Sequence, residues 1–150
     1  MSGPATPPLA QLTIRADTHE TRRASQWLVA AADANRVPAD ATIRLDHCLD
    51  EALANVVAHG GPAATASSIG LHFAVRRNAG ACAADLTLLY DGLAFDPSRH
   101  EPRPRPANLQ DASLGGLGLV MLRHFADALE YDRSDGRNRL TITVNWTEAT

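Results

Sequence analysis

Alternation of apolar and polar residues recurs along five short segments of the chain and predicts β-strands. Leu12 and Ile14 show it near the N-terminus, and Leu140, Ile142 and Val144 show it near the C-terminus. Glycine-containing turns separate the second segment from the third and the fourth from the fifth, so each pair is expected to form a hairpin. The predicted strands are residues 10–16, 67–77, 83–90, 129–133 and 139–146.

Apolar residues with the 3.6-residue period of a helix fill the segment between the first two predicted strands. The first helix there is expected to begin at Thr18, whose side chain can cap it. The second is expected to end cleanly at the Gly-Gly-Pro run of residues 60–62. A third helix is expected to follow a glycine cluster in the C-terminal half. The predicted helices are residues 18–35, 41–59 and 115–128.

The order of these elements predicts an α+β fold. Runs of strands separated from a few helices are typical of a two-layer sandwich, in which helices cover one face of a mixed, mostly antiparallel sheet. Residues 98–114 contain three prolines and show little periodicity, so we expect a mobile loop there. Residues 1–9 are predicted to form a flexible, Pro-rich leader, and residues 10–150 a single domain.

Composition narrows the choice of function. The formal net charge is -3, whereas a protein that binds duplex nucleic acid is usually basic, so we expect no direct contact with nucleic acid. All 14 basic residues are arginine, which excludes a P-loop lysine and lysine Schiff-base chemistry. The sequence has no apolar run of the ~20 residues that span a bilayer and no secretory signal, so we expect a cytoplasmic protein without membrane contact.

Three polar residues in the second predicted helix are candidates for chemistry. Glu51, Asn55 and His59 are four residues apart, and each such step turns the helix by ~40° beyond a full circle, so they form one stripe. We expect this stripe to lie largely away from the apolar face of the helix. A carboxylate can accept a proton from a hydroxyl group, and an amide oxygen is a suitable ligand for Mg²⁺. Taken alone, the stripe is better explained as a solvated polar face.

Two glycine-containing segments are candidates for contact with phosphate or nucleotide. Residues 92–97 follow directly on a predicted strand, where Gly92 permits a sharp exit and Pro97 ends the strand. Residues 115–118 precede a predicted helix, where glycines let the backbone approach an anion at the helix N-terminus. Each segment alone is also consistent with an ordinary turn or helix entry.

The conjunction of these motifs is more specific than any of them. Together they resemble the ATP-binding domain shared by histidine kinases, gyrase-type ATPases and the bacterial anti-sigma-factor serine kinases, and the last group is the most similar. The resemblance covers roughly residues 10–146. Its four blocks occur in order as the Glu51–Asn55–His59 helix, the Gly92–Pro97 turn, the Gly115–Leu119 helix entry and the Asp135–Leu140 hairpin.

The resemblance implies a role for each motif. Glu51 would be the general base, Asn55 would bind Mg²⁺, and the segment from about Ser98 to Leu114 would close over ATP as a lid. Gly116 and Gly118 would let the backbone wrap the phosphates. The residues that the resemblance assigns to nucleotide binding are Asn55, His59, Asp91, Gly92, Phe95, Gly115, Gly116, Leu117, Gly118 and Leu119. The implied cofactors are ATP and Mg²⁺.

The chain departs from the family at the adenine site. Family members carry Asp-x-Gly at the end of this strand, and that aspartate hydrogen-bonds the adenine amino group. Here Tyr90 occupies the aspartate position, and Asp91 follows it. Because successive strand side chains point to opposite faces, Asp91 replaces the missing carboxylate only if a bulge re-aims it. A lost charged hydrogen bond of this kind costs ~1.5–3 kcal/mol.

Two functions follow from the resemblance. In the first, the protein is an anti-sigma-factor serine/threonine kinase that binds a sigma factor, phosphorylates a serine of an antagonist protein and so regulates transcription by partner switching. In the second, it is a non-catalytic partner-binding regulator with a weakened or lost ATP site. Family members are commonly dimers, so the resemblance leaves a homodimer open. A histidine-kinase fragment is a less favoured third class.

Overall fold

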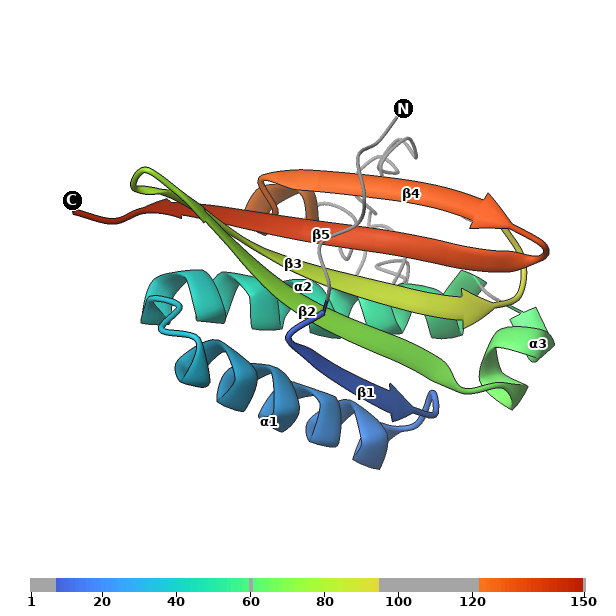
Figure 1. Ribbon diagram of the computed structural model, residues 1–150. Helices are drawn as coiled ribbons and strands as arrows, with labels where there is room; N and C mark the ends of the chain where they lie inside the picture. The colour runs from blue at the N-terminus through green and yellow to red at the C-terminus, as the bar shows by residue number, and fades with distance from the viewer. Residues whose placement is uncertain (1–7, 60, 95–121, 150) are drawn as a thin grey trace, which may run out of the picture.

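A five-stranded sheet forms one layer of the protein, and its strands lie in the order β1-β2-β3-β5-β4 (Figure 1). The computed structural model describes residues 8–59, 61–94 and 122–149. The four strand pairs among these residues are all antiparallel, whereas a mixed, mostly antiparallel sheet was expected. The strands are β1 (Ala10–Ile14), β2 (Ile69–Asn78), β3 (Ala81–Asp91), β4 (Ala128–Ser134) and β5 (Arg137–Thr147).

Helices form the second layer on one face of the sheet, as the element order predicted (Figure 1). The long helices are α1 (Thr18–Ala34) and α2 (Ala39–His59), and residues 122–125 form a further helical turn. A six-residue helix, α3 (Gly61–Ala66), follows α2 where the Gly-Gly-Pro run was expected to lead into a strand. The α+β sandwich is therefore confirmed, with one additional short helix.

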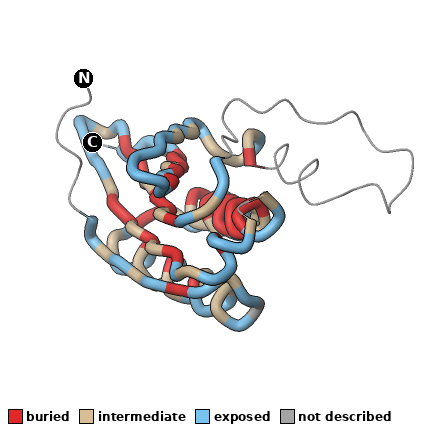
Figure 2. The backbone as a smooth tube through the Cα atoms, turned by 90° about the vertical axis from the view of Figure 1, so that its right-hand side faces the viewer, coloured by how far each residue is buried: buried red, intermediate tan, exposed pale blue. Residues whose placement is uncertain are grey.

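The core lies between the two layers. The register pairs Leu86 with Ile142 and Leu88 with Leu140 across the central strands, and all four side chains are buried. Leu45 and Leu49 of α2 are fully buried in the same apolar cluster. Buried residues accordingly run through strands and helices alike (Figure 2). This apolar contact fixes α2 against β3 and β5.

The first helix is capped one residue earlier than expected. Asp17, not Thr18, is the N-cap, and its Oδ1 accepts a hydrogen bond from the backbone N–H of Glu20 at 2.9 Å. The extended backbone of Asp17, with φ of -140° and ψ of 165°, is typical of a cap. Glu20 lies at the third helical position. Its carboxylate pairs with Arg23 at 2.8 Å and does not reach back to the backbone N–H of the cap. The helix start was thus predicted correctly and its capping residue was not.

Other boundaries differ by a few residues. The helix predicted to continue to Ala128 ends at Phe125, and β4 begins at Ala128.

Both hairpins turn over two residues, and all four turn residues have positive φ: Ala79, Gly80, Asp135 and Gly136. Such turns match the right-handed twist of the strands they join.

Several sequence-based expectations lie outside the described residues. These are most of the leader, the loop at residues 98–114 and the glycine cluster at residues 115–118. Within the described segments, no helix is both long and apolar enough to cross a lipid bilayer.

The packing of α2 predicts a large difference between two positions on that helix. Leu49→Ala removes a fully buried side chain and should lower the free energy of unfolding by about 2–5 kcal/mol, as measured by urea denaturation. Ile43→Ala on the same helix is the matched control, because Ile43 is 57% exposed and should change stability by only about 0.5 kcal/mol or less. Equal effects at the two positions would contradict the proposed packing of α2 on the sheet.

Candidate functional site

The C-terminal half of α2 carries the three polar residues that the helical spacing placed on one stripe. Asn55 is only 5% exposed, whereas Glu51 and His59 are half-buried. Leu53, two residues before Asn55, and Val56, directly after it, are buried core residues. The stripe is therefore not a solvated face, and the expectation that it lies away from the apolar face is wrong for Asn55. Because α2 contacts α1 and α3 as well as the sheet, its buried surface extends around more of the helix than the apolar stripe alone.

The amide group of Asn55 is buried, and its surroundings are unusual for a polar group in a core. Within the described part of the chain, neither its Oδ1 nor its Nδ2 has a hydrogen-bond partner. A buried polar group in this state typically costs ~1–3 kcal/mol, so such a residue is expected to serve something other than stability. An amide oxygen held in this way is a suitable donor for Mg²⁺.

The rest of the described chain offers this metal few other ligands. No group of three or more His, Cys, Asp or Glu side chains is positioned to hold a metal ion among the described residues. Mg²⁺ commonly binds through one or two protein oxygens, with substrate phosphates and water completing its coordination. The single amide at Asn55 fits that mode of binding and does not fit a metal cage built wholly from protein ligands.

Glu51 lies one helical turn before Asn55 in an environment that strengthens it as a base. Burial raises the pKa of the Glu51 carboxyl, the negative charge of Asp50 adds to the rise, and His47 opposes it. Burial likewise raises the pKa of Asp50, with a further contribution from Asp46. A raised pKa makes Glu51 a better proton acceptor than an ordinary surface carboxylate.

The end of β3 places Tyr90 and Asp91 on opposite faces of the sheet. Tyr90 is 4% exposed and belongs to the core on the helix-covered face, while Asp91 is exposed. The regular pairing with β5 continues through Tyr90↔Asn138 to Asp91↔Arg137, so no bulge re-aims the aspartate. The helix-covered face therefore presents a tyrosine where the family carries a carboxylate.

The turn after β3 is held by side chains from the closing hairpin. Gly92 has φ of 125°, a conformation that favours glycine. Its carbonyl oxygen accepts hydrogen bonds from Arg133 Nη1 at 2.8 Å and from Asn138 Nδ2 at 3.4 Å. Asn138 Nδ2 also lies 3.5 Å from the carbonyl oxygen of Leu93. Sequence reasoning matched the hairpin to the family but gave Asn138 no role, although the conspicuous Asp-Gly-Arg-Asn block was the available signal.

The fold brings this turn close to the end of α2. A Cβ atom added to Gly61, the first residue of α3, would lie 3.3 Å from Leu93 Cδ1. The end of β3, α3 and the end of α2 accordingly lie at one end of the molecule (Figure 1). Residues 51–59 and Gly92, which are distant in the sequence, therefore share one site. The remaining candidates lie outside the described residues: Phe95, Gly115, Gly116, Leu117, Gly118 and Leu119.

The helical turn at residues 122–125 is also tied to α2. Arg44 donates hydrogen bonds to Asp127 Oδ2 at 3.1 Å, to the carbonyl oxygen of Asn145 at 2.8 Å and to that of Phe125 at 3.4 Å. The ring of Phe125 stacks on His47, with centroids 5.1 Å apart. These contacts connect the segment that follows the glycine cluster to the helix that carries Glu51.

Comparison with known proteins agrees with this geometry. The model of the histidine kinase-like ATPase domain matches residues 14–144. The chain belongs to that family. The serine/threonine-protein kinase BtrW of Bordetella bronchiseptica is 38% identical over 121 residues, which are 78% of this chain and 80% of that protein. The family expected from the four sequence blocks is therefore confirmed.

A more distant likeness carries no argument about function. A chain in the crystal structure of the SiaB–SiaC complex from Pseudomonas aeruginosa superposes with a TM-score of 0.49 and 13% identity. The match covers 93% of this chain and 91% of the other.

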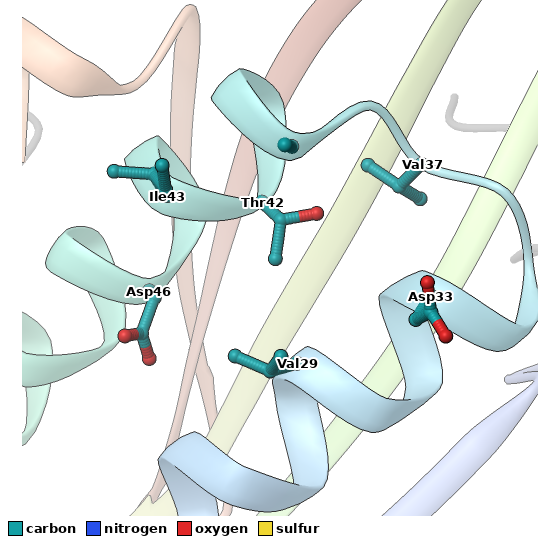
Figure 3. Close-up of a pocket in the computed structure, with 7 residues that line it drawn as sticks. Val29, Asp33, Val37, Thr42, Ile43 and Asp46 are labelled. Carbon is teal, nitrogen blue, oxygen red and sulfur yellow. The ribbon is translucent and has the colours of Figure 1, made fainter.

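A separate pocket in this ATPase domain lies between α1 and the start of α2 (Figure 3). Its volume is about 300 Å³, and Val29 and Ile43 line it beside the carboxylates of Asp33 and Asp46. None of the nucleotide-site candidates among the described residues borders it. The candidate site is therefore the end of α2 and the β3 turn, and not this pocket.

The environment of Glu51 predicts its titration. Its pKa, measured by carboxyl-carbon NMR, should lie above that of an ordinary glutamate and should fall in Asp50→Asn, because that change removes a neighbouring negative charge. Since the folded-state pKa is raised, protonated Glu51 favours folding, and this contribution is lost as the pH rises through that pKa. Glu51→Gln should therefore gain stability over the wild type above the folded-state pKa.

The control for this titration is Glu130→Gln on the exposed side of β4, which should leave the pKa of Glu51 unchanged. A wild-type Glu51 that titrates at or below the ordinary glutamate value would show that burial does not act on this carboxyl as described.

Proposed function

We propose that this chain is an anti-sigma-factor-like serine/threonine kinase that binds ATP with Mg²⁺ and phosphorylates a serine of an antagonist protein. The observation that carries the proposal is Asn55, whose buried amide has no hydrogen-bond partner within the described residues and lies one turn from Glu51. Membership of the ATPase-domain family and the serine/threonine-protein kinase among its relatives support it.

The proposed reaction assigns a separate task to each of these two residues. Glu51 accepts the proton of the substrate serine hydroxyl. As it does so, the serine oxygen bonds to the γ-phosphorus, and the bond between that phosphorus and the departing ADP oxygen breaks. Asn55 Oδ1 would hold Mg²⁺, and the bound ion would neutralise part of the negative charge of the phosphates. Phosphoryl transfer depends mainly on positioning and charge neutralisation, so a rigid helix that carries both residues is sufficient for this half of the site.

The proposed nucleotide contacts continue along α2 to His59 and extend beyond it to Asp91 and Gly92. Of these, Asp91 lies on the exposed face, away from Tyr90. The proposed partners are a sigma factor and its antagonist, and transcription would be regulated in the cytoplasm by exchange between them, without direct contact with DNA. A homodimer remains compatible with this scheme.

Tyr90 favours a second candidate function. A buried tyrosine at the position of the adenine-binding carboxylate suits a partner-binding regulator in which the ATP site is weakened or lost. The two candidates differ in nucleotide binding, so calorimetry separates them.

Calorimetric titration with ATP should show binding that is stronger with Mg²⁺ than without it. Asn55→Ala should lose most of the Mg²⁺-dependent part and weaken ATP–Mg²⁺ binding by at least about tenfold, because the metal loses its protein ligand. Asn78→Ala, at an exposed asparagine at the end of β2, is the matched control and should bind like the wild type. An absence of wild-type binding at millimolar nucleotide would rule out the kinase and leave the regulator.

Glu51→Gln should separate binding from chemistry. The substitution keeps the shape of the side chain but removes its basicity, so ATP–Mg²⁺ should still bind while phosphoryl transfer falls by about 10²–10⁴-fold. The measurement is transfer of labelled phosphate to the antagonist protein at saturating ATP. Glu130→Gln serves again as the control with full activity. Undiminished transfer in Glu51→Gln would remove Glu51 from its assigned role.

A further inference from the structure

A group of polar side chains from the β4–β5 hairpin lies against the turn that follows β3. This group, called here the Asn138 clamp, consists of Tyr131, Arg133 and Asn138. We propose that Asn138 is a positioning residue that holds Gly92 and Leu93 in place for the adenine end of the nucleotide. The inference rests on the proposed function, because the family resemblance is what places adenine at the end of β3.

Asn138 is the centre of this clamp. Its side chain is fully buried, and its Oδ1 accepts hydrogen bonds from the Tyr131 hydroxyl and from Arg133 Nη1, the latter at 2.8 Å. Its Nδ2 is directed to the carbonyl oxygens of Gly92 and Leu93, at 3.4 and 3.5 Å. Strands β4 and β5 thus orient one amide whose donor group is directed at the turn.

Arg133 binds the turn by a second route. The same Nη1 that bonds Asn138 lies 2.8 Å from the Gly92 carbonyl oxygen. Regular pairing of β3 with β5 ends at Asp91↔Arg137, so Gly92 and Leu93 lie beyond the ladder that fixes the rest of the strand. Beyond the end of the backbone ladder, side-chain hydrogen bonds from Arg133 and Asn138 hold Gly92 and Leu93.

The position of this turn matters because of Tyr90. Tyr90 and Asn138 are direct cross-strand partners on the helix-covered face, and the carboxylate of Asp91 is on the other face. With no carboxylate at the adenine position, the fit of the base depends on where the main chain of Gly92 and Leu93 lies. The clamp should therefore affect ATP and ADP equally and leave the phosphate-transfer step at saturating ATP unchanged.

Asn138→Asp tests the donor specifically. It keeps the oxygen that Tyr131 and Arg133 bind, but it replaces the Nδ2 donor with an oxygen that repels the Gly92 and Leu93 carbonyls. We expect Kd for ATP and for ADP to rise by about tenfold each, as calorimetry measures it, with kcat at saturating ATP within about twofold of wild type. We also expect the carbonyl-carbon NMR resonances of Gly92 and Leu93 to shift in the nucleotide-free protein, because their oxygens lose the Nδ2 donor.

Two matched controls distinguish positioning from loss of stability. Thr143→Ala removes a part-buried hydrogen bond of β5, the 2.7 Å bond from Thr143 Oγ1 to Asp85 Oδ1, away from the turn. It should lower the urea midpoint without changing either Kd or the carbonyl resonances of Gly92 and Leu93. Arg133→Ala, at an exposed residue whose loss should not prevent folding, should reproduce the affinity loss in part, whereas Arg139→Ala on the exposed face of β5 should not.

The outcomes are separable from those that test the kinase. If the wild type binds no nucleotide, the proposed function fails, and the carbonyl resonances of Gly92 and Leu93 in Asn138→Asp still decide whether Asn138 holds the turn. If Asn138→Asp matches Thr143→Ala in these resonances and in affinity, the positioning role is overturned and Asn138 is a residue of stability alone. A loss for ATP that spares ADP also overturns it, because such a loss belongs to the γ-phosphate end.

Discussion

The contact between α2 and the central strands is the constraint on which the rest of this structure depends. Leu45 and Leu49 pack against the β3 and β5 core, which includes Leu86 and Ile142. This packing fixes both the rotation of the helix and its height over the sheet. The same apolar surface that stabilises the domain therefore holds Glu51 and Asn55 at the end of the molecule where β3 stops. Fold and candidate site share one helix, so the site inherits the rigidity of the core.

Two buried asparagines illustrate how the domain distributes polar groups. Asn138 is fully buried and its amide is hydrogen-bonded on both sides, as is usual for a polar group in a core. Asn55 is almost as buried, yet its amide atoms have no hydrogen-bond partner in the described part of the chain. The first arrangement stabilises a turn. The arrangement at Asn55 lowers stability, and a bound metal–nucleotide ligand would offset that cost.

The family assignment and the departure at Tyr90 fit together in this arrangement. The residues expected to bind the metal and accept the proton lie on α2, which is tied through Arg44 to the segment after the glycine cluster. The adenine end would lie at the β3 exit, where the structure has a buried tyrosine and a turn held by side-chain hydrogen bonds instead of a carboxylate. The two ends of the nucleotide would therefore be recognised by independent parts of the fold, and a change at one need not abolish the other.

The sequence by itself determined the element order, the α+β class and the family, because periodicity and motif spacing are local properties. It also determined that Glu51, Asn55 and His59 share a stripe and that Asp91 points away from the position of Tyr90. It did not reveal α3, the Asp17 cap or the burial of Asn55. Burial depends on what packs against a helix in three dimensions, and no local pattern encodes that. The role of Asn138 was decided only by the tertiary structure, because its bonds to Gly92 and Leu93 join residues 45 or more positions apart.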